Sequence, residues 1–269
     1  MKNKVLGTVM GAALLAGSGA AVADDMFAAE NFSATLTFTT DYVFRGTTFS
    51  NNDAAIQGSF DWGYGPWFAG AWASSQGELD TGGGSAGATM ELDLYFGWAD
   101  TVGPFDLMVM PLWYTYPGQE GGSGGGRDDQ TFELWTSAGM GFDSLPGTPY
   151  VTLSVNYSDE FFDCTACTGD AEEALYYSLG VAFALPDGWG IDFLWGHQDV
   201  GGDSTSGSVN NDFFGDDYDH WNVGLTKSAA GFDFDIRYHD NEDADKLNSY
   251  LGADFASDGD LVLSVSRSF

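Results

Sequence analysis

The chain has 269 residues, a formal net charge of −32 at neutral pH, 16% aromatic residues and 38 glycines. A surface this acidic does not attract nucleic acid or anionic headgroups through its charge, so we expect no nucleic-acid partner. A disordered acidic chain would contain few aromatic residues, whereas a membrane barrel combines aromatic girdles with a polar lumen.

The N-terminal segment has the features of a secretory signal peptide. Lys2 and Lys4 form a positively charged region, residues 5–16 are apolar and small, and Ala21-Val22-Ala23 is an A-x-A cleavage signal. The apolar run is too short for the roughly 20 residues that a spanning helix needs. We therefore expect residues 1–23 to be cleaved on export and residues 24–269 to form a single domain.

The remaining chain alternates apolar and polar residues in segments of about ten residues, which is typical of β-strands. In the first segment Phe38 and Phe44 share the apolar face, while Asp41 and Arg45 share the polar one. Segment 105–116 is apolar on both faces, so its facing is not predicted. The segments cover 32–45, 54–64, 67–74, 90–98, 105–116, 130–140, 151–157, 175–183, 191–195, 221–226, 232–239 and 261–269.

The connections alternate between short turns and long polar stretches, as in outer-membrane barrels with short periplasmic turns and long extracellular loops. Residues 247–255 also alternate weakly, but bacterial barrels have even strand counts, so we assign them to the last loop. The sequence predicts an all-β fold, a closed antiparallel transmembrane β-barrel of about 12 strands in the outer membrane of a Gram-negative bacterium. The short turns lie near 63–66, 101–104, 143–149, 186–188 and 228–231.

A soluble β-sandwich would alternate in the same way, but two features argue against it. The polar faces carry acids, serine and glycine with almost no lysine, unlike a solvated exterior. Aromatic residues also gather at strand ends as two interfacial girdles. We assign Trp62, Tyr64, Trp67, Tyr150, Trp189 and Phe232 to the turn side, and Phe44, Trp72, Trp113, Tyr157, Trp195 and Trp221 to the loop side.

The C-terminus resembles the assembly signal of outer-membrane barrels. Phe269 follows alternating apolar residues, although Arg267 interrupts that alternation. We therefore expect Phe269 to be needed for insertion and the barrel-assembly machinery to be a partner, together with outer-membrane lipid and lipopolysaccharide.

Four segments resemble the TorF-type porin family, also labelled Gcw_chp. They are Thr40-Asp41-Tyr42-Val43-Phe44-Arg45-Gly46, Ala55-Ile56-Gln57-Gly58-Ser59-Phe60-Asp61, Ala69-Gly70-Ala71-Trp72-Ala73-Ser74 and Glu91-Leu92-Asp93-Leu94-Tyr95. The ending Leu263-Ser264-Val265-Ser266-Arg267-Ser268-Phe269 is similar too. The resemblance spans the chain after the signal peptide and implies a twelve-stranded barrel with a porin function. It implies no substrate and no catalytic residues.

Few residues have the chemistry of an enzyme or a metal centre. Cys164 and Cys167 lie in a long loop without a thioredoxin-like context, so we expect a local disulfide formed after export. A catalytic triad needs a serine, a base and an acid, yet there are only three histidines and no G-x-S-x-G elbow, so we expect no enzyme. His197 falls on the lipid-facing side of its strand, and His220 and His239 fall on the lumen side.

Acidic clusters in the loops could bind calcium or magnesium through carboxylate oxygens, or bridge to lipopolysaccharide through such ions. No EF-hand spacing is present, so a solvated run of charges is the simpler interpretation, and we expect no cofactor. The clusters are Asp212, Asp216, Asp217 and Asp219, and Asp240, Glu242, Asp243 and Asp245.

The predicted lumen carries an excess of acidic side chains. Barrels of about eight strands are filled by side chains and those of sixteen or more leave channels, so about twelve leaves the opening undecided. A channel for passive diffusion of small solutes, with a preference for cations, is the first hypothesis. A non-conducting surface barrel whose acidic loops bind ions, ligands or partners is the second, and a lipid-active enzyme is the third. The predicted channel-lining residues are Asp41, Arg45, Asp61, Glu91, Asp93, Asp192, Asp233, Asp235 and Arg237.

Overall fold

The computed structural model describes residues 25–77, 88–118, 131–159, 173–199, 217–243 and 259–269. The predicted signal peptide lies outside these residues, and so do Cys164, Cys167 and the weakly alternating segment 247–255. Among the described residues, no helix is long and apolar enough to cross a membrane.

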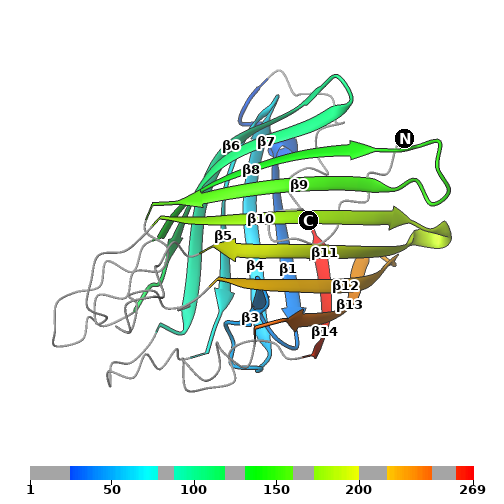
Figure 1. Cartoon of the computed structure of the whole chain (residues 1–269). Helices are drawn as coiled ribbons and strands as arrows, with labels where there is room; N and C mark the ends of the chain where they lie inside the picture. Colours follow the sequence, from blue (N-terminus) through cyan, green and yellow to red (C-terminus); the bar gives the residue numbers. More distant parts are fainter. Residues whose placement is uncertain (1–24, 78–87, 119–130, 160–172, 200–216, 244–258) are drawn as a thin grey trace.

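Twelve antiparallel strands form one closed barrel, which confirms the predicted fold class (Figure 1). Each strand pairs with its neighbour along the chain, and β1 closes the barrel by pairing with β14. The strands are β1 (Phe32–Thr39), β4 (Ala55–Tyr64), β5 (Trp67–Ser75), β6 (Met90–Val102), β7 (Phe105–Thr115), β8 (Thr131–Gly141), β9 (Tyr150–Ser158), β10 (Ala174–Ala184), β11 (Trp189–Asp199), β12 (Tyr218–Ala229), β13 (Phe232–Asn241) and β14 (Asp260–Ser268).

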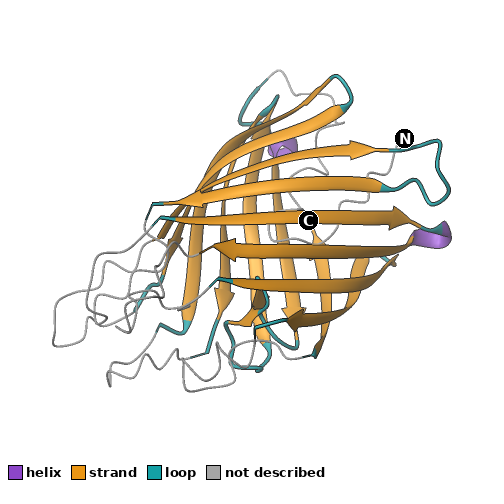
Figure 2. Cartoon of the chain, viewed as in Figure 1, coloured by secondary structure: helices purple, strands orange, loops and turns teal. Residues whose placement is uncertain are grey.

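Short connections join the strands at one end of the barrel (Figure 2). The β12–β13 turn has only two residues, Ala230 and Gly231, both with positive φ, which is the type I′ geometry that suits twisted hairpins. The short helix η3 (Pro186–Gly188) connects β10 to β11, and η2 (Ala29–Asn31) precedes β1 at the same end. The other connections join strands at the opposite end, so the predicted alternation of turns and loops holds.

The barrel wall has its apolar side chains outside and its polar side chains inside. On β9, Leu153 is 58% exposed, whereas Asn156, on the other face, is 2% exposed. A water-soluble protein would bury the apolar set, and this large exposed apolar surface is stable in hydrocarbon. Closure also leaves no strand edge without hydrogen bonds, which is what lipid requires of a spanning sheet. The fold is therefore that of a transmembrane barrel.

Strand β7 shows the facing that the sequence left open. Met110, Leu112 and Tyr114 are buried inside the barrel, while Val109 and Trp113 face outward and are exposed. The apolar inner face contacts the aromatic residues of a segment that folds into the lumen, described below.

The first predicted segment is wrong beyond Thr39. Strand β1 ends there, and the chain turns into the barrel instead of continuing along its wall. Phe44 is consequently 6% exposed inside the lumen and belongs to no girdle. Trp72 also faces inward, where its ring contacts Tyr42, and Tyr150 faces inward to bond Asp106. The position of an aromatic residue near a strand end therefore does not predict which face of the barrel wall it lies on, because both the lipid side and the lumen side accept aromatic rings.

The start of β1 and the end of β14 meet at the short-turn end of the barrel. The Phe269 amide and carbonyl both bond to the backbone of Ala34, at 2.9 and 3.2 Å. Arg267 lies with its guanidinium 5.2 Å from the Phe232 ring centre and 5.3 Å from that of Phe269. This placement over aromatic faces accounts for a cation on an otherwise apolar surface. The role of Phe269 in assembly stays a prediction.

The inside-out arrangement predicts opposite responses at two adjacent residues of β9. Leu153→Arg places a charge in hydrocarbon and should lower the free energy of unfolding by about 2–4 kcal/mol, because the cost is largest near the bilayer midplane. Ser154→Arg, on the inner face, is the matched control and should change it by much less. Reversible denaturant unfolding in lipid vesicles measures both. Equal losses for the two variants would contradict the assigned facing.

Candidate functional site

A short hairpin between β1 and β4 enters the lumen. Its strands, β2 (Val43–Phe44) and β3 (Thr47–Thr48), are joined by Arg45 and Gly46. Both turn residues have positive φ, +49° and +75°, which is a type I′ turn. Glycine adopts this conformation without cost, but an arginine held there stores strain on the order of 1–3 kcal/mol. The contacts of the hairpin must therefore outweigh that strain.

Polar side chains hold the base of the hairpin. One carboxylate oxygen of Asp41 accepts hydrogen bonds from the hydroxyls of Thr48 and Ser50, both at 2.6 Å. Desolvation raises the pKa of the Asp41 carboxyl, although these two hydrogen bonds act in the opposite direction. Thr40 pairs with the backbone of Leu263 on β14 at 2.9 and 3.0 Å. The base is therefore fixed to the wall beside β1.

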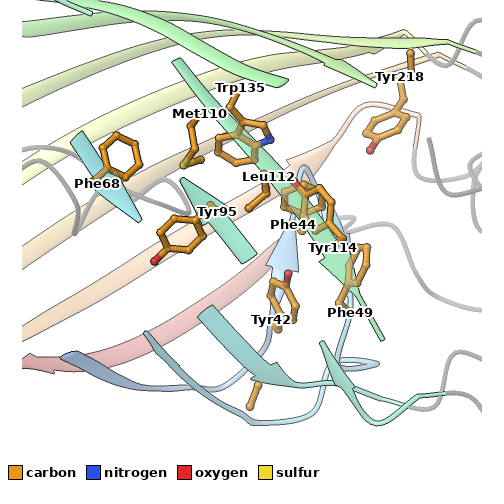
Figure 3. Packing of buried hydrophobic residues seen from close by; sticks show 12 residues of the cluster. Tyr42, Phe44, Phe49, Phe68, Tyr95, Met110, Leu112, Tyr114, Trp135 and Tyr218 are labelled. Atoms are coloured by element: carbon orange, nitrogen blue, oxygen red, sulfur yellow. The ribbon is translucent and has the colours of Figure 1, made fainter. Parts of the chain in front are cut away.

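Aromatic rings fill the space between the hairpin and the wall (Figure 3). Tyr42 packs against Phe49 and Trp72, with ring centres 5.4 and 5.5 Å apart. Phe44 packs against Phe49 at 5.7 Å and against Tyr114 of β7 at 6.0 Å. These rings are buried, so this level of the lumen has the packing of a protein core.

The tip of the hairpin inserts Arg45 into the opposite wall. Its guanidinium forms two parallel hydrogen bonds with the Glu133 carboxylate, at 2.9 and 2.8 Å, and a third with Gln198 at 2.8 Å. When the amide oxygen of Asn156 faces the guanidinium, it accepts a fourth bond at 3.1 Å. The Tyr176 ring centre lies 4.1 Å from the guanidinium carbon. We call Glu133, Trp135, Asn156, Tyr176 and Gln198 the Arg45 pocket.

The hairpin crosses the whole lumen. The Arg45 pocket lies on β8, β9, β10 and β11, and β9 is the strand farthest from β1 in the closed order. The Arg45 side chain is 3% exposed and that of Glu133 is 1% exposed. A glycine is required beside Arg45, because a Cβ on Gly46 would lie 2.6 Å from the Cβ of His220. Among the described residues, the hairpin and the Arg45 pocket therefore occupy the lumen from β1 to the opposite strands at this level.

The pairing keeps Arg45 charged despite its burial. Desolvation is the largest single effect and lowers the pKa of the guanidinium, but the charge and hydrogen bonds of Glu133, together with Tyr114 and Tyr176, raise that pKa by more, so the net shift is upward. The same carboxylate also accepts hydrogen bonds from Tyr114 and from the Trp135 indole, both at 2.7 Å. A buried ion pair of this kind holds only when its remaining lone pairs are satisfied in this way.

The other predicted channel-lining residues form separate groups. Glu91 accepts a hydrogen bond from Tyr42 at 3.0 Å, and it lies beside Asp93 on the buried inner face of β6. Asp61 bonds to Tyr95 and Ser59. Asp233 is exposed at the short-turn end. Arg237 of β13 bonds to Asp192, Asp235 and Asn222.

The structure thus brings Asp192, Asp235 and Arg237 together, and it corrects the position of Asp41 and Arg45. These two were predicted to share the lumen face of one strand, but they lie at the base and the tip of the inserted hairpin. Sequence reasoning did not select Glu133, the main partner of Arg45, although the alternation of β8 places Glu133 on the lumen side. The signal for the hairpin is the pair Arg45-Gly46 between Phe44 and Thr47, because a glycine-containing pair between apolar or β-branched residues indicates a two-residue turn.

The described residues do not cluster as metal ligands. No group of three or more histidine, cysteine or acidic side chains in that part of the chain is arranged to hold an ion. Of the acidic loop clusters, Asp212, Asp216 and Asp245 lie outside it.

The buried ion pair predicts a strong effect of removing one partner. Glu133→Gln leaves the Arg45 charge without a counter-charge and should destabilise the inserted hairpin by about 3–5 kcal/mol. Arg45→Met with Glu133→Gln removes both charges and should cost less. The readout is hydrogen exchange of the Phe49 amide, which bonds to Tyr42 at 2.7 Å. Asp192→Asn, beside Arg237, is the control and should leave that amide unchanged; unaltered exchange in Glu133→Gln would contradict the assignment.

Comparisons with known proteins agree with this architecture. The COG4313 outer membrane channel from Pseudomonas putida F1 has a similar fold, with a TM-score of 0.51, 10% identity, and coverage of 88% of this chain and 95% of that one. A KdgM porin gives a TM-score of 0.49 at 6% identity, covering 88% and 99%. No curated protein sequence matches. A family model described as "Bacterial protein of unknown function (Gcw_chp)" matches residues 24–269, and the chain belongs to the Gcw_chp family.

Proposed function

We propose that this barrel is an outer-membrane channel for small solutes that prefers cations, and that the inserted hairpin limits its flow. The observation that carries the proposal is the charge of the lumen. Arg45 and Arg237 are each neutralised by carboxylates. Asp41, Asp61 and the Glu91–Asp93 pair form no ion pair with arginine or lysine in the described part of the chain. Carboxylates lining a pore favour cations.

We propose that solutes approach the hairpin through the half of the lumen nearer the short turns. Near mid-barrel the inner face carries the partly exposed Thr35, Ser137 and Ser154, and closer to the turns it also carries the buried rings of Phe68 and Tyr95. The hairpin occupies only the other half. Opening would therefore require movement of one short segment, while the closed wall of twelve strands stays intact.

The similarity to the COG4313 channel supports the same proposal at the level of fold. Outer-membrane lipid and lipopolysaccharide are the surroundings that this outer face fits, and we propose the barrel-assembly machinery as the partner that inserts it. We also propose that the acidic loops bind ions at the extracellular end.

A non-conducting surface barrel is the second candidate. The burial of Arg45 and Glu133 favours it, because nothing solvent-sized passes between side chains that are 3% and 1% exposed. In that case the acidic loops, rather than the lumen, would bind ions, ligands or partners.

We do not propose an enzymatic function. His197 lies on the outer face with Nδ1 3.0 Å from an Asp219 oxygen, as in part of a triad. Within the described residues, however, no serine hydroxyl bonds to its ring. Of the two inward histidines, His220 contacts the Tyr176 hydroxyl through Nε2 at 3.0 Å.

Cation preference is tested by the reversal potential across a KCl gradient in a planar bilayer. We expect a cation-selective value with small conductance, and a weaker preference at high salt, because loop charges act only over about 8 Å at physiological ionic strength. The double variant Glu91→Gln with Asp93→Asn removes two lumen carboxylates and should shift the reversal potential towards zero.

Asp100→Asn with Asp187→Asn is the matched control, since both residues are exposed at the short-turn end outside the lumen. This pair should leave the potential where it was. An anion-selective pore would overturn the proposed preference. A folded protein without conductance, with or without Arg45, would favour the surface barrel.

A further inference from the structure

The Arg45 pocket is built entirely from the barrel wall. Glu133 and Trp135 lie on β8, Asn156 on β9, Tyr176 on β10 and Gln198 on β11. The cation that they surround belongs instead to a turn of two residues. The receptor groups are therefore fixed by the sheet, and the group that fills them lies on a separate segment.

The chemistry of the pocket fits a guanidinium group specifically. A carboxylate accepts two parallel N–H bonds at 2.9 and 2.8 Å, which matches the planar fork of a guanidinium and not the compact head of an ammonium ion. Gln198 accepts a further bond at 2.8 Å. The Tyr176 ring, 4.1 Å away, offers the flat face on which a guanidinium stacks.

Two donors on the barrel wall orient the Glu133 carboxylate in addition to Arg45. Its Oε2 accepts hydrogen bonds from the Tyr114 hydroxyl and the Trp135 indole, both at 2.7 Å. These donors belong to β7 and β8 of the wall, and the Tyr114 ring also packs against Phe44 of the hairpin. A binding group held by neighbouring side chains on rigid strands is preorganised for its ligand.

The arginine that fills the pocket is held in an unfavourable backbone conformation. Its φ is +49°, a region that non-glycine residues enter at a cost of about 1–3 kcal/mol. Release of the side chain would remove that strain. The internal ligand is thus weaker than its hydrogen bonds alone suggest.

We propose that the Arg45 pocket is a binding site for the guanidinium group of a solute, and that Arg45 occupies it as a tethered competitor. The inference rests on the proposed channel function and names its solute class: small cations that carry a guanidinium group. A tethered side chain competes at an effective concentration in the millimolar range, so a solute displaces it only when abundant or when it makes further contacts.

The test removes the Arg45 side chain from the Arg45 pocket while preserving the two-residue turn of the hairpin. Arg45→Gly gives a Gly-Gly pair, and Arg45→Asn gives an Asn-Gly pair, and both pairs are favoured in type I′ turns. Heat-modifiable gel migration identifies the folded protein. Guanidinium chloride is then titrated by calorimetry at constant ionic strength, with ammonium chloride as the comparison cation.

Both variants should bind guanidinium, and should bind ammonium at least about tenfold more weakly, since one lost charge-assisted hydrogen bond changes affinity by roughly that factor. Adding Glu133→Gln should weaken guanidinium binding by at least about tenfold for the same reason. Adding Asp100→Asn, which removes an exposed charge at the short-turn end outside the lumen, should leave guanidinium binding unchanged. The unsubstituted protein should bind more weakly than either variant, because Arg45 competes.

Conductance of the same variants separates this inference from the proposed function. If they conduct, guanidinium should reduce their potassium current in parallel with its binding. Binding without any conductance would uphold the site and overturn the channel. Conductance with no guanidinium binding by either folded variant, or binding unaffected by Glu133→Gln, would overturn the site.

Discussion

Closure of the sheet is the constraint on which the rest of this structure depends. In hydrocarbon every backbone N–H and C=O group needs a partner within the protein, and an open sheet would leave one row unpaired at each edge. The pairing of β1 with β14 removes both edges. Closure also fixes the side-chain directions, because alternate residues must face either lipid or the lumen. The outer face is apolar for this reason, and polar residues collect inside.

The interior of a barrel of this width must be either filled by protein or left open to water. Side chains alone fill smaller barrels, and larger ones leave a water-filled channel. Here the hairpin of β2 and β3 supplies the missing volume at the loop end, with Phe44 and Phe49 packed against the wall. This segment gives a membrane protein a small hydrophobic core, enclosed by a polar inner wall. The interior therefore has one half that is packed around the hairpin and another half that the hairpin does not enter.

Charge controls how firmly the packed half is held. An arginine at the tip of the hairpin is costly to bury, and Glu133 makes the burial tolerable by forming a two-point ion pair that is itself bonded to Tyr114 and Trp135. Such a pair gives geometric specificity more than net stability, because both ions lose their hydration. The contact is therefore suited to selecting one position of the hairpin, and a competing cation could replace it.

The period-two pattern predicted the alternation of turns and loops and the faces of most strands, since lipid selects apolar residues at every second position, and together with the even strand number of bacterial barrels it predicted the strand count. It placed Asp192, Asp235 and Arg237 on the lumen side, where they lie. It could not show where a strand stops: Asp41 and Arg45 continue the alternation of β1, yet the chain leaves the wall after Thr39. Only the tertiary structure decided that Arg45 meets Glu133, because periodicity assigns a face to each residue but no partner across the lumen. The partner depends on how far a loop reaches into the closed barrel, and no local pattern encodes that distance.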